Sequence, residues 1–140
     1  VNAAFGLLQL RSVDSAIASR KRINDFYHEK LAGIKGLTLV GFDARASSNY
    51  SYFPILVESD FPISRDALYE RLKEEMIFAR RYFYPLISNF PMYSSLPSAA
   101  PINLPIATQI ADRVLCLPIY PDLSTENQIR IYDVIKQCSH

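Results

Sequence analysis

The sequence has 140 residues, a net charge of +1 and an apolar content of 49%, with nine Tyr and eight Phe. This length fits one domain with a hydrophobic core. The small net charge and the scattered basic residues exclude a protein that holds nucleic acid or an anionic membrane through a broad positive field. No apolar run approaches the ~20 residues of a membrane span.

The two cysteines, Cys116 and Cys138, lie 22 positions apart and show neither a CxxC motif nor a metal-binding spacing. Two scattered histidines add no ligand cluster, so no metal site is predicted. We expect two reduced, structural thiols in a cytoplasmic protein.

The first ten residues predict a helix that is apolar almost all round. Its large apolar residues are Phe5, Leu7, Leu8 and Leu10. Such a helix must be buried on several sides, and this one begins without the Ser, Thr, Asp or Asn that usually caps a helix. We therefore expect a further domain that precedes this helix and covers part of it.

A second helix is predicted over 14–31, with Ala16, Ile23, Tyr27 and Leu31 at helical spacing. Gly33 and Gly36 end it. Residues 1–33 are thus predicted to be a helical segment that links to the missing large domain, and residues 34–140 to be an α+β domain.

Within 34–140 the pattern predicts strands over 37–42, 50–58, 78–84 and 114–117. Pro54 cannot donate to a ladder, which predicts an edge strand or a bulge. A proline-broken loop follows the third strand, and loops of this length are usually functional or disordered.

Helices are predicted from Ser64, from Pro105 to Arg113 and from Leu123 onward. The apolar stripes are expected to be Leu68, Leu72 and Met76 in the first, Ile106 and Ile110 in the second, and Ile131, Val134, Ile135 and Cys138 in the last. Ser124, or Thr125 with Gln128, would cap the last helix, and Arg71 can pair with Glu75. The order predicts an α+β fold with a small, mainly antiparallel sheet and helices on one face.

The five lysines, Lys21, Lys30, Lys35, Lys73 and Lys136, all have polar or loop surroundings. A lysine that forms a Schiff base needs a lowered pKa, usually from an apolar pocket or a nearby cation. No catalytic residue is therefore predicted in this chain.

The candidate site lies in the predicted strand 78–84. Alternation would place Arg80, Tyr82 and Tyr84 on one face and Arg81 and Phe83 on the other. An arginine beside two tyrosines can bind a phosphate and lay a ring against a sugar or a base. The alternative is a half-buried strand whose arginines extend to water.

Several motifs in this order resemble the C-terminal portion of the DegT/StrS family of sugar aminotransferases, over nearly the whole chain. The matching segments are 3–10, 20–27, 64–66, 79–85, 91–93 and 111–121. The stretch 80–88 looks closest to members that act on thymidine-diphosphate keto-deoxysugars.

The resemblance implies an aspartate-aminotransferase-like fold (fold type I), of which this chain would be the small C-terminal domain, and a homodimer. It also implies a large N-terminal domain whose lysine holds pyridoxal phosphate, with no cofactor expected on this chain alone. The substrate would be a nucleotide-linked keto-deoxysugar, and the resemblance favours one linked to dTDP. Arg80, Arg81, Tyr82 and Tyr84 would lie where the small domain approaches it.

Two positions depart from the family pattern: Met76 stands where many members have glycine, and no histidine follows Pro85 closely. A histidine contact to the substrate is therefore not expected. The other interpretation left open is a free-standing, non-catalytic binding or oligomerisation module derived from this domain.

Overall fold

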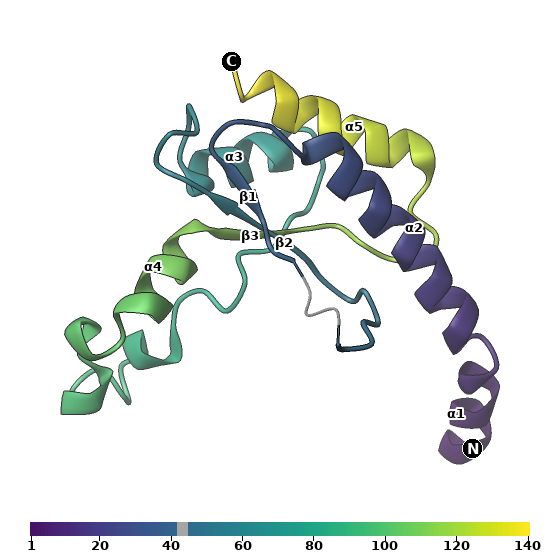
Figure 1. Ribbon diagram of the computed structural model, residues 1–140. Coiled ribbons are helices and arrows are strands. Elements are labelled where there is room, and N and C mark those ends of the chain that lie inside the picture. Colours follow the sequence, from purple (N-terminus) through teal and green to yellow (C-terminus); the bar gives the residue numbers. More distant parts are fainter. Residues whose placement is uncertain (42–44) are drawn as a thin grey trace.

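The structure is a computed structural model that describes residues 1–41 and 45–140. A three-stranded sheet lies at its centre, with α-helices around it and a segment of short 3-10 helices projecting from it (Figure 1). In chain order the elements are α1 (Asn2–Leu10), α2 (Val13–Leu31), β1 (Leu37–Leu39), β2 (Phe53–Val57), α3 (Arg65–Glu74), η1 (Ile87–Asn89), η2 (Pro97–Ala99), η3 (Pro101–Asn103), α4 (Pro105–Arg113), β3 (Val114–Leu117) and α5 (Thr125–Gln137).

The sheet is antiparallel in the order β1-β2-β3, which confirms the predicted sheet type. Phe53, Ile55 and Val57 alternate with less buried residues and face the core. Ile55 lies opposite Leu115, and neither side chain is exposed to solvent. The helices α2, α3 and α5 supply much of the rest of this core, so they cover one face of the sheet.

The prediction for Pro54 was wrong, because β2 is the central strand. The pairing with β1 ends at Leu39, opposite Ile55, so Pro54 lies just beyond the end of β1. On its other side it lies opposite Cys116, whose backbone N–H and carbonyl both bond to Arg80 instead. The missing N–H therefore interrupts no ladder hydrogen bond. The strand predicted over 37–42 is shorter than expected, and its predicted last residue lies outside the described residues.

The helix ends follow local chemistry. The hydroxyl oxygens of Ser64 and Ser124 accept hydrogen bonds from the backbone N–H groups of Ala67 (3.2 Å) and Asn127 (3.3 Å), so Ser124 caps α5. Gly36 follows α2 with φ of 79°, and a Cβ there would lie 2.4 Å from the backbone nitrogen of Phe61. Only glycine fits this turn.

Met76 does not extend the apolar stripe of α3, contrary to prediction. The helix ends at Glu74, and Met76 is 69% exposed with φ of 58°, in the left-handed region. Glycine reaches this conformation without strain. The glycine that many members of the resembled family have at this position therefore has a backbone reason.

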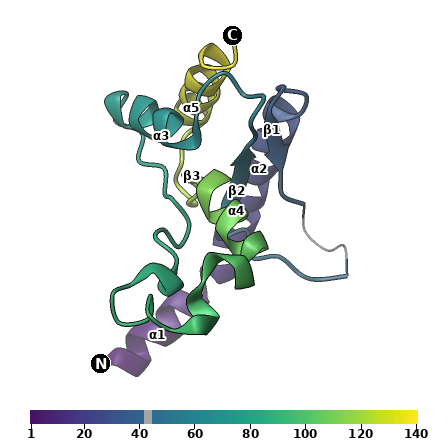
Figure 2. The same ribbon diagram turned by 90° about the vertical axis from the view of Figure 1, so that its left-hand side faces the viewer.

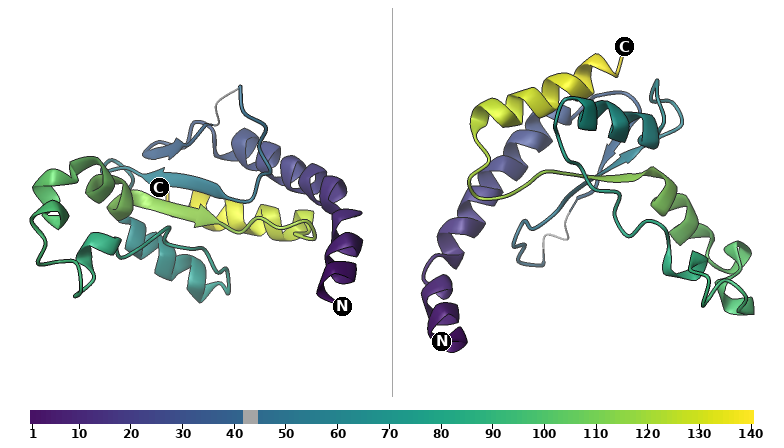
Figure 3. Two further views of the ribbon diagram at one scale, coloured as in Figure 1. Left: turned by 90° about the horizontal axis from the view of Figure 1, so that it is seen from below. Right: turned by 180° about the vertical axis from the view of Figure 1, so that it is seen from behind.

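Two parts of the molecule extend beyond the packed core, α1 and the segment 85–110, here called the arm (Figures 1 and 2). The view from behind in Figure 3 shows them on opposite sides of the sheet. No residue of α1 is buried, although a helix this apolar was expected to be covered. In the arm, Ile106 and Ile110 were predicted to face inward but are exposed, and Ala111 is the buried residue of α4.

Within residues 1–41 and 45–140, no helix has the length and apolarity needed to cross a bilayer. The division of the chain at residue 33 stays a prediction, although Ile23, Tyr27 and Leu31 of α2 belong to the same core as the later residues.

Candidate functional site

The segment 78–84 does not form the predicted strand. Only Arg80 pairs with β3: its N–H donates to the carbonyl of Cys116 at 2.9 Å, and the N–H of Cys116 donates to the carbonyl of Arg80 at 2.8 Å. Side chains alternate as far as this residue, with Ile77 and Ala79 buried and Arg80 exposed. The regular pattern then ends, and Phe83 adopts φ of 46°.

The ladder stops at one pair, and the residues that would extend it on either side of Cys116 have other hydrogen-bond partners. In the antiparallel register Phe78 would face Pro118, which has no N–H, and whose carbonyl accepts the Tyr27 hydroxyl at 2.9 Å. On the other side Tyr82 would face Val114, whose carbonyl accepts a hydrogen bond from Nη1 of Arg65 at 3.1 Å. The sequence pattern could reveal the proline but not these two side-chain competitors.

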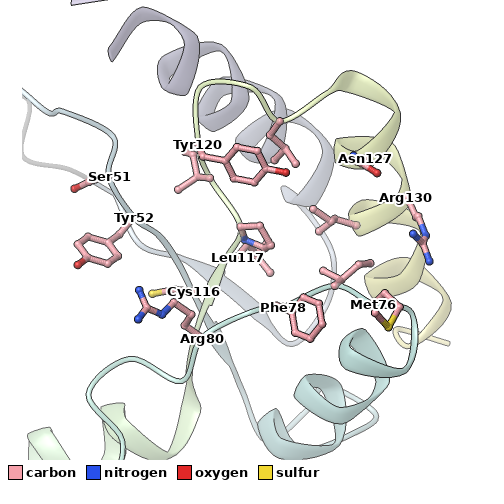
Figure 4. Close-up of a pocket in the computed structure, with 15 residues that line it drawn as sticks. Ser51, Tyr52, Met76, Phe78, Arg80, Cys116, Leu117, Tyr120, Asn127 and Arg130 are labelled. Carbon is pink, nitrogen blue, oxygen red and sulfur yellow. The ribbon is translucent and has the colours of Figure 1, made fainter. Parts of the chain in front are cut away.

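A pocket of about 400 Å³ lies beside β3, between the separated segments 76–78 and 117–120 and the first turns of α5. Its walls are largely apolar, with Phe78, Leu117 and Ile131 among them. Arg80 and Arg130 stand on opposite sides of it (Figure 4). No acidic residue among the described residues lines it, so it suits a ligand with an apolar or planar part and an anionic group.

A smaller pocket of about 120 Å³ adjoins the first one, and the two share Tyr52, Arg80 and Cys116. Tyr82 borders this smaller pocket, and its ring centroid lies 5.2 Å from that of Tyr52 in an edge-on arrangement. The structure thus brings three predicted site residues, Arg80, Arg81 and Tyr82, together with Tyr52 at the smaller pocket.

Tyr84 is not on the face of Arg80, contrary to the predicted alternation. Its ring lies between two guanidinium groups, with the central carbon of Arg65 4.7 Å and that of Arg81 5.2 Å from the ring centroid. Arg81 also lies 4.5 Å from the ring centroid of Tyr69, and its Nη1 is 3.2 Å from Oδ1 of Asp66. The adjacent arginines therefore have different partners: Arg81 borders the smaller pocket but its guanidinium is bound to α3, whereas Arg80 borders both pockets.

The environment of the site keeps its buried acids neutral. Burial raises the pKa of the Cys116 thiol to about 11, against the opposing effect of the Arg80 charge. Burial also raises the pKa of the Tyr27 hydroxyl, which keeps it a hydrogen-bond donor to Pro118. Cys116 and Cys138 are both free, as predicted.

The pocket residues that were not predicted from the sequence include Tyr52, Tyr120 and Arg130. Tyr52 precedes β2, and strand alternation places it on the same face as Pro54, which could have indicated its position from the sequence. Nothing in the sequence distinguishes Arg130 from other exposed helical arginines, because its place at the pocket depends on how α5 packs.

Residues 1–136 match the sequence pattern of the DegT/DnrJ/EryC1/StrS aminotransferase family. The chain belongs to this family. Its members are aminotransferases that use pyridoxal phosphate, and the match confirms the resemblance stated from the motifs.

Among curated relatives, the chain is 52% identical over 131 residues to dTDP-4-amino-4,6-dideoxy-D-glucose transaminase from Escherichia coli. That match covers 94% of this chain and 35% of the relative. GDP-perosamine synthase from Vibrio cholerae is 30% identical over 139 residues, covering 96% of this chain and 35% of the relative. The chain thus spans about a third of the length of these relatives.

Solved structures of sugar-modifying enzymes share the fold. DesV from S. venezuelae, in complex with a ketimine intermediate, gives a TM-score of 0.83 at 26% identity, over 99% of this chain and 36% of that chain. DesI in the presence of its TDP-sugar product gives 0.82 at 26% identity, over 98% of this chain and 34% of that chain.

The residues of this chain do not fit a site for pyridoxal phosphate on their own. All five lysines are exposed, and Lys21 has a raised pKa because it bonds to Asp25. A Schiff-base lysine requires the opposite shift. No group of three potential metal ligands lies together in the described residues.

Proposed function

We propose that this chain is the C-terminal domain of an aminotransferase that acts on a nucleotide-linked keto-deoxysugar, most closely of the dTDP-linked kind. The observation that carries this proposal is the 52% identity to a dTDP-sugar transaminase over 94% of this chain. In this proposal the domain is the small domain of a fold type I enzyme, which works as a cytoplasmic homodimer.

The chemistry belongs to the part of the enzyme that this chain does not include. The chain spans about 35% of its relatives, and its lysines are solvated cations rather than candidates for a Schiff base. When bound in the complete enzyme, pyridoxal phosphate supplies the carbanion stabilisation that amino-group transfer needs. This domain contributes one wall of the substrate cleft.

Arg80 is the residue of this wall that we propose contacts the substrate diphosphate. It is exposed and borders both pockets, and the neighbouring Cys116 is neutral, so its charge is available to an anion. Tyr82 and Tyr52 provide aromatic surface for the sugar or the base. Arg81 and Tyr84, predicted in the same role, are proposed to support this wall, since both engage residues of α3.

The test compares the chain with the full-length enzyme that contains it. Incubated with pyridoxal phosphate and desalted, the chain alone is expected to show no absorbance band at about 420 nm, because it has no suitable lysine. The full-length enzyme is expected to show the band and to transfer an amino group to a dTDP-keto-deoxysugar. A stable yellow form of the chain alone would contradict the inability to act alone, and a full-length enzyme inactive on every nucleotide-linked keto sugar would contradict the substrate class.

A further inference from the structure

Arg65 is buried where a buried cation is costly. Its residue surface is 4% exposed, and it occupies the first position of α3, where the helix dipole disfavours a positive charge. A buried charged side chain needs hydrogen-bonding or charged partners that offset the loss of water. The partners of Arg65 therefore indicate its role.

Arg65 contacts both ends of the arm. At the end of the arm, its Nη1 donates to the carbonyls of Ala111 at 2.9 Å and Val114 at 3.1 Å. At the beginning, its guanidinium lies over the ring of Tyr84, 4.7 Å from the centroid. One side chain thus joins two points of the chain that 26 residues of projecting segment separate.

Arg65 also engages the residue of β3 at which the ladder with segment 78–84 stops. Val114 would pair with Tyr82 if that ladder continued. Its carbonyl accepts from Nη1 of Arg65 and its N–H bonds to the carbonyl of Ile110, so both of its backbone groups already have partners where the chain leaves the sheet. Asp66 lies near both arginines. Its Oδ1 is 2.9 Å from Nε of Arg65 and 3.2 Å from Nη1 of Arg81. The contact with Arg65 is an ion pair whose geometry is not that of a hydrogen bond.

We propose that Arg65, with Asp66 and Tyr84, is a positioning residue that clamps the base of the arm and thereby holds Arg80 and Tyr82 against the pockets. The effect of this clamp on substrate binding rests on the proposed function. The clamp itself is a property of this chain.

The first experiment measures hydrogen exchange in this chain for Arg65→Met, which keeps an unbranched apolar side chain but removes the guanidinium with its charge and donors. Amides of α4, such as that of Thr108, are expected to exchange at least about tenfold faster, because two buried carbonyls lose their donor and the arm loses its anchor. Amides in α2 and α5 are expected to change by less than about twofold. The matched control is Arg71→Met in the same helix, whose guanidinium pairs with Glu75 at 2.9 Å and whose side chain is 38% exposed.

Unchanged exchange in α4 would overturn the clamp, and so would an equal increase in all helices, since that would reflect general destabilisation. If Arg65→Met does not fold, Tyr84→Leu tests the same clamp from a residue that is 44% exposed. Tyr84→Phe keeps a ring between the guanidinium groups and is expected to restore protected α4 amides. A Leu variant that behaves like the Phe variant would also overturn the proposal.

The second experiment uses the full-length enzyme. Arg65→Met is expected to raise KM for the nucleotide sugar about tenfold and to leave kcat within about twofold, because it displaces a binding wall and not a reacting group. Equal loss in both parameters would overturn the positioning role. A failure of the proposed substrate would leave the hydrogen-exchange result unaffected, so the two proposals fail separately.

Discussion

The half of the molecule built from the sheet with α2, α3 and α5 differs from the arm in what it does with apolar residues. In the first, leucine and isoleucine side chains such as Leu68, Leu115 and Ile135 are fully buried. In the arm, Met92, Ile102 and Ile106 are each more than two-thirds exposed. The arm, residues 85–110, has five prolines and no charged residue, yet most of its large apolar side chains stay exposed, so apolar character alone does not decide burial.

The difference teaches that the arm is not held by a core of its own. Its contacts with the sheet are few, and polar and cation–aromatic contacts around Arg65 fix its base. Apolar surface exposed on this scale is typical of an interaction site. In the proposed enzyme this surface, like that of α1, faces the parts that this chain does not include.

The largest expected effect separates the two regions by stability. Leu115→Ala in β3 is expected to lower the free energy of unfolding by about 2–5 kcal/mol, because it leaves a cavity in a fully buried place. Ile102→Ala in the arm, where the side chain is 86% exposed, is expected to change it by less than about 0.5 kcal/mol. Urea denaturation of both variants measures this, and comparable losses would mean that the arm is packed in solution.

The second effect concerns the junction of the two regions. In the full-length enzyme Arg80→Ala is expected to weaken affinity for the nucleotide sugar about tenfold or more, as the loss of a charged hydrogen bond to phosphate predicts. Arg22→Ala on α2, where the guanidinium bonds only to Ser19 in the described structure, serves as the matched control. Calorimetric titration gives both affinities. A change of less than about threefold for Arg80→Ala would make Arg80 a structural residue.

The smallest effect sharpens the account of how α3 ends within the packed half. Met76→Gly is expected to raise the free energy of unfolding by roughly 1 kcal/mol, because glycine adopts the left-handed conformation at φ of 58° without strain. Met76→Ala keeps the strain and loses only an exposed side chain, so it is expected to show no such gain. Thermal unfolding compares the three proteins, and a stabilised Ala variant would show that removal of the exposed side chain is the cause.

The predictions that held concern features that residues close together in the sequence determine. The strand predicted over 50–58 contains β2, and Ser64 and Ser124 cap the helices expected of them. The family resemblance, carried by short motifs in order, was confirmed over residues 1–136.

The predictions that failed concern residues whose partners lie far away in the chain. The alternation over 78–84 ends after Arg80, where the backbone groups of Val114 have partners in Arg65 and Ile110 rather than in Tyr82. Ile106 and Ile110 have helical spacing, but both are exposed because the described residues of this chain do not cover them. The strand with Pro54 can be the central one because β1 ends before it reaches Pro54.

By itself the sequence determined the helices and their caps, the absence of a suitable Schiff-base lysine and the family. These depend on the spacing of residues within one element or on residue type. Only the tertiary structure decided which of two adjacent arginines borders both pockets. Arg80 does so, whereas the guanidinium of Arg81, at the edge of the smaller pocket, is bound to Asp66 and Tyr69 on α3, and that difference rests on contacts between segments that no local pattern records.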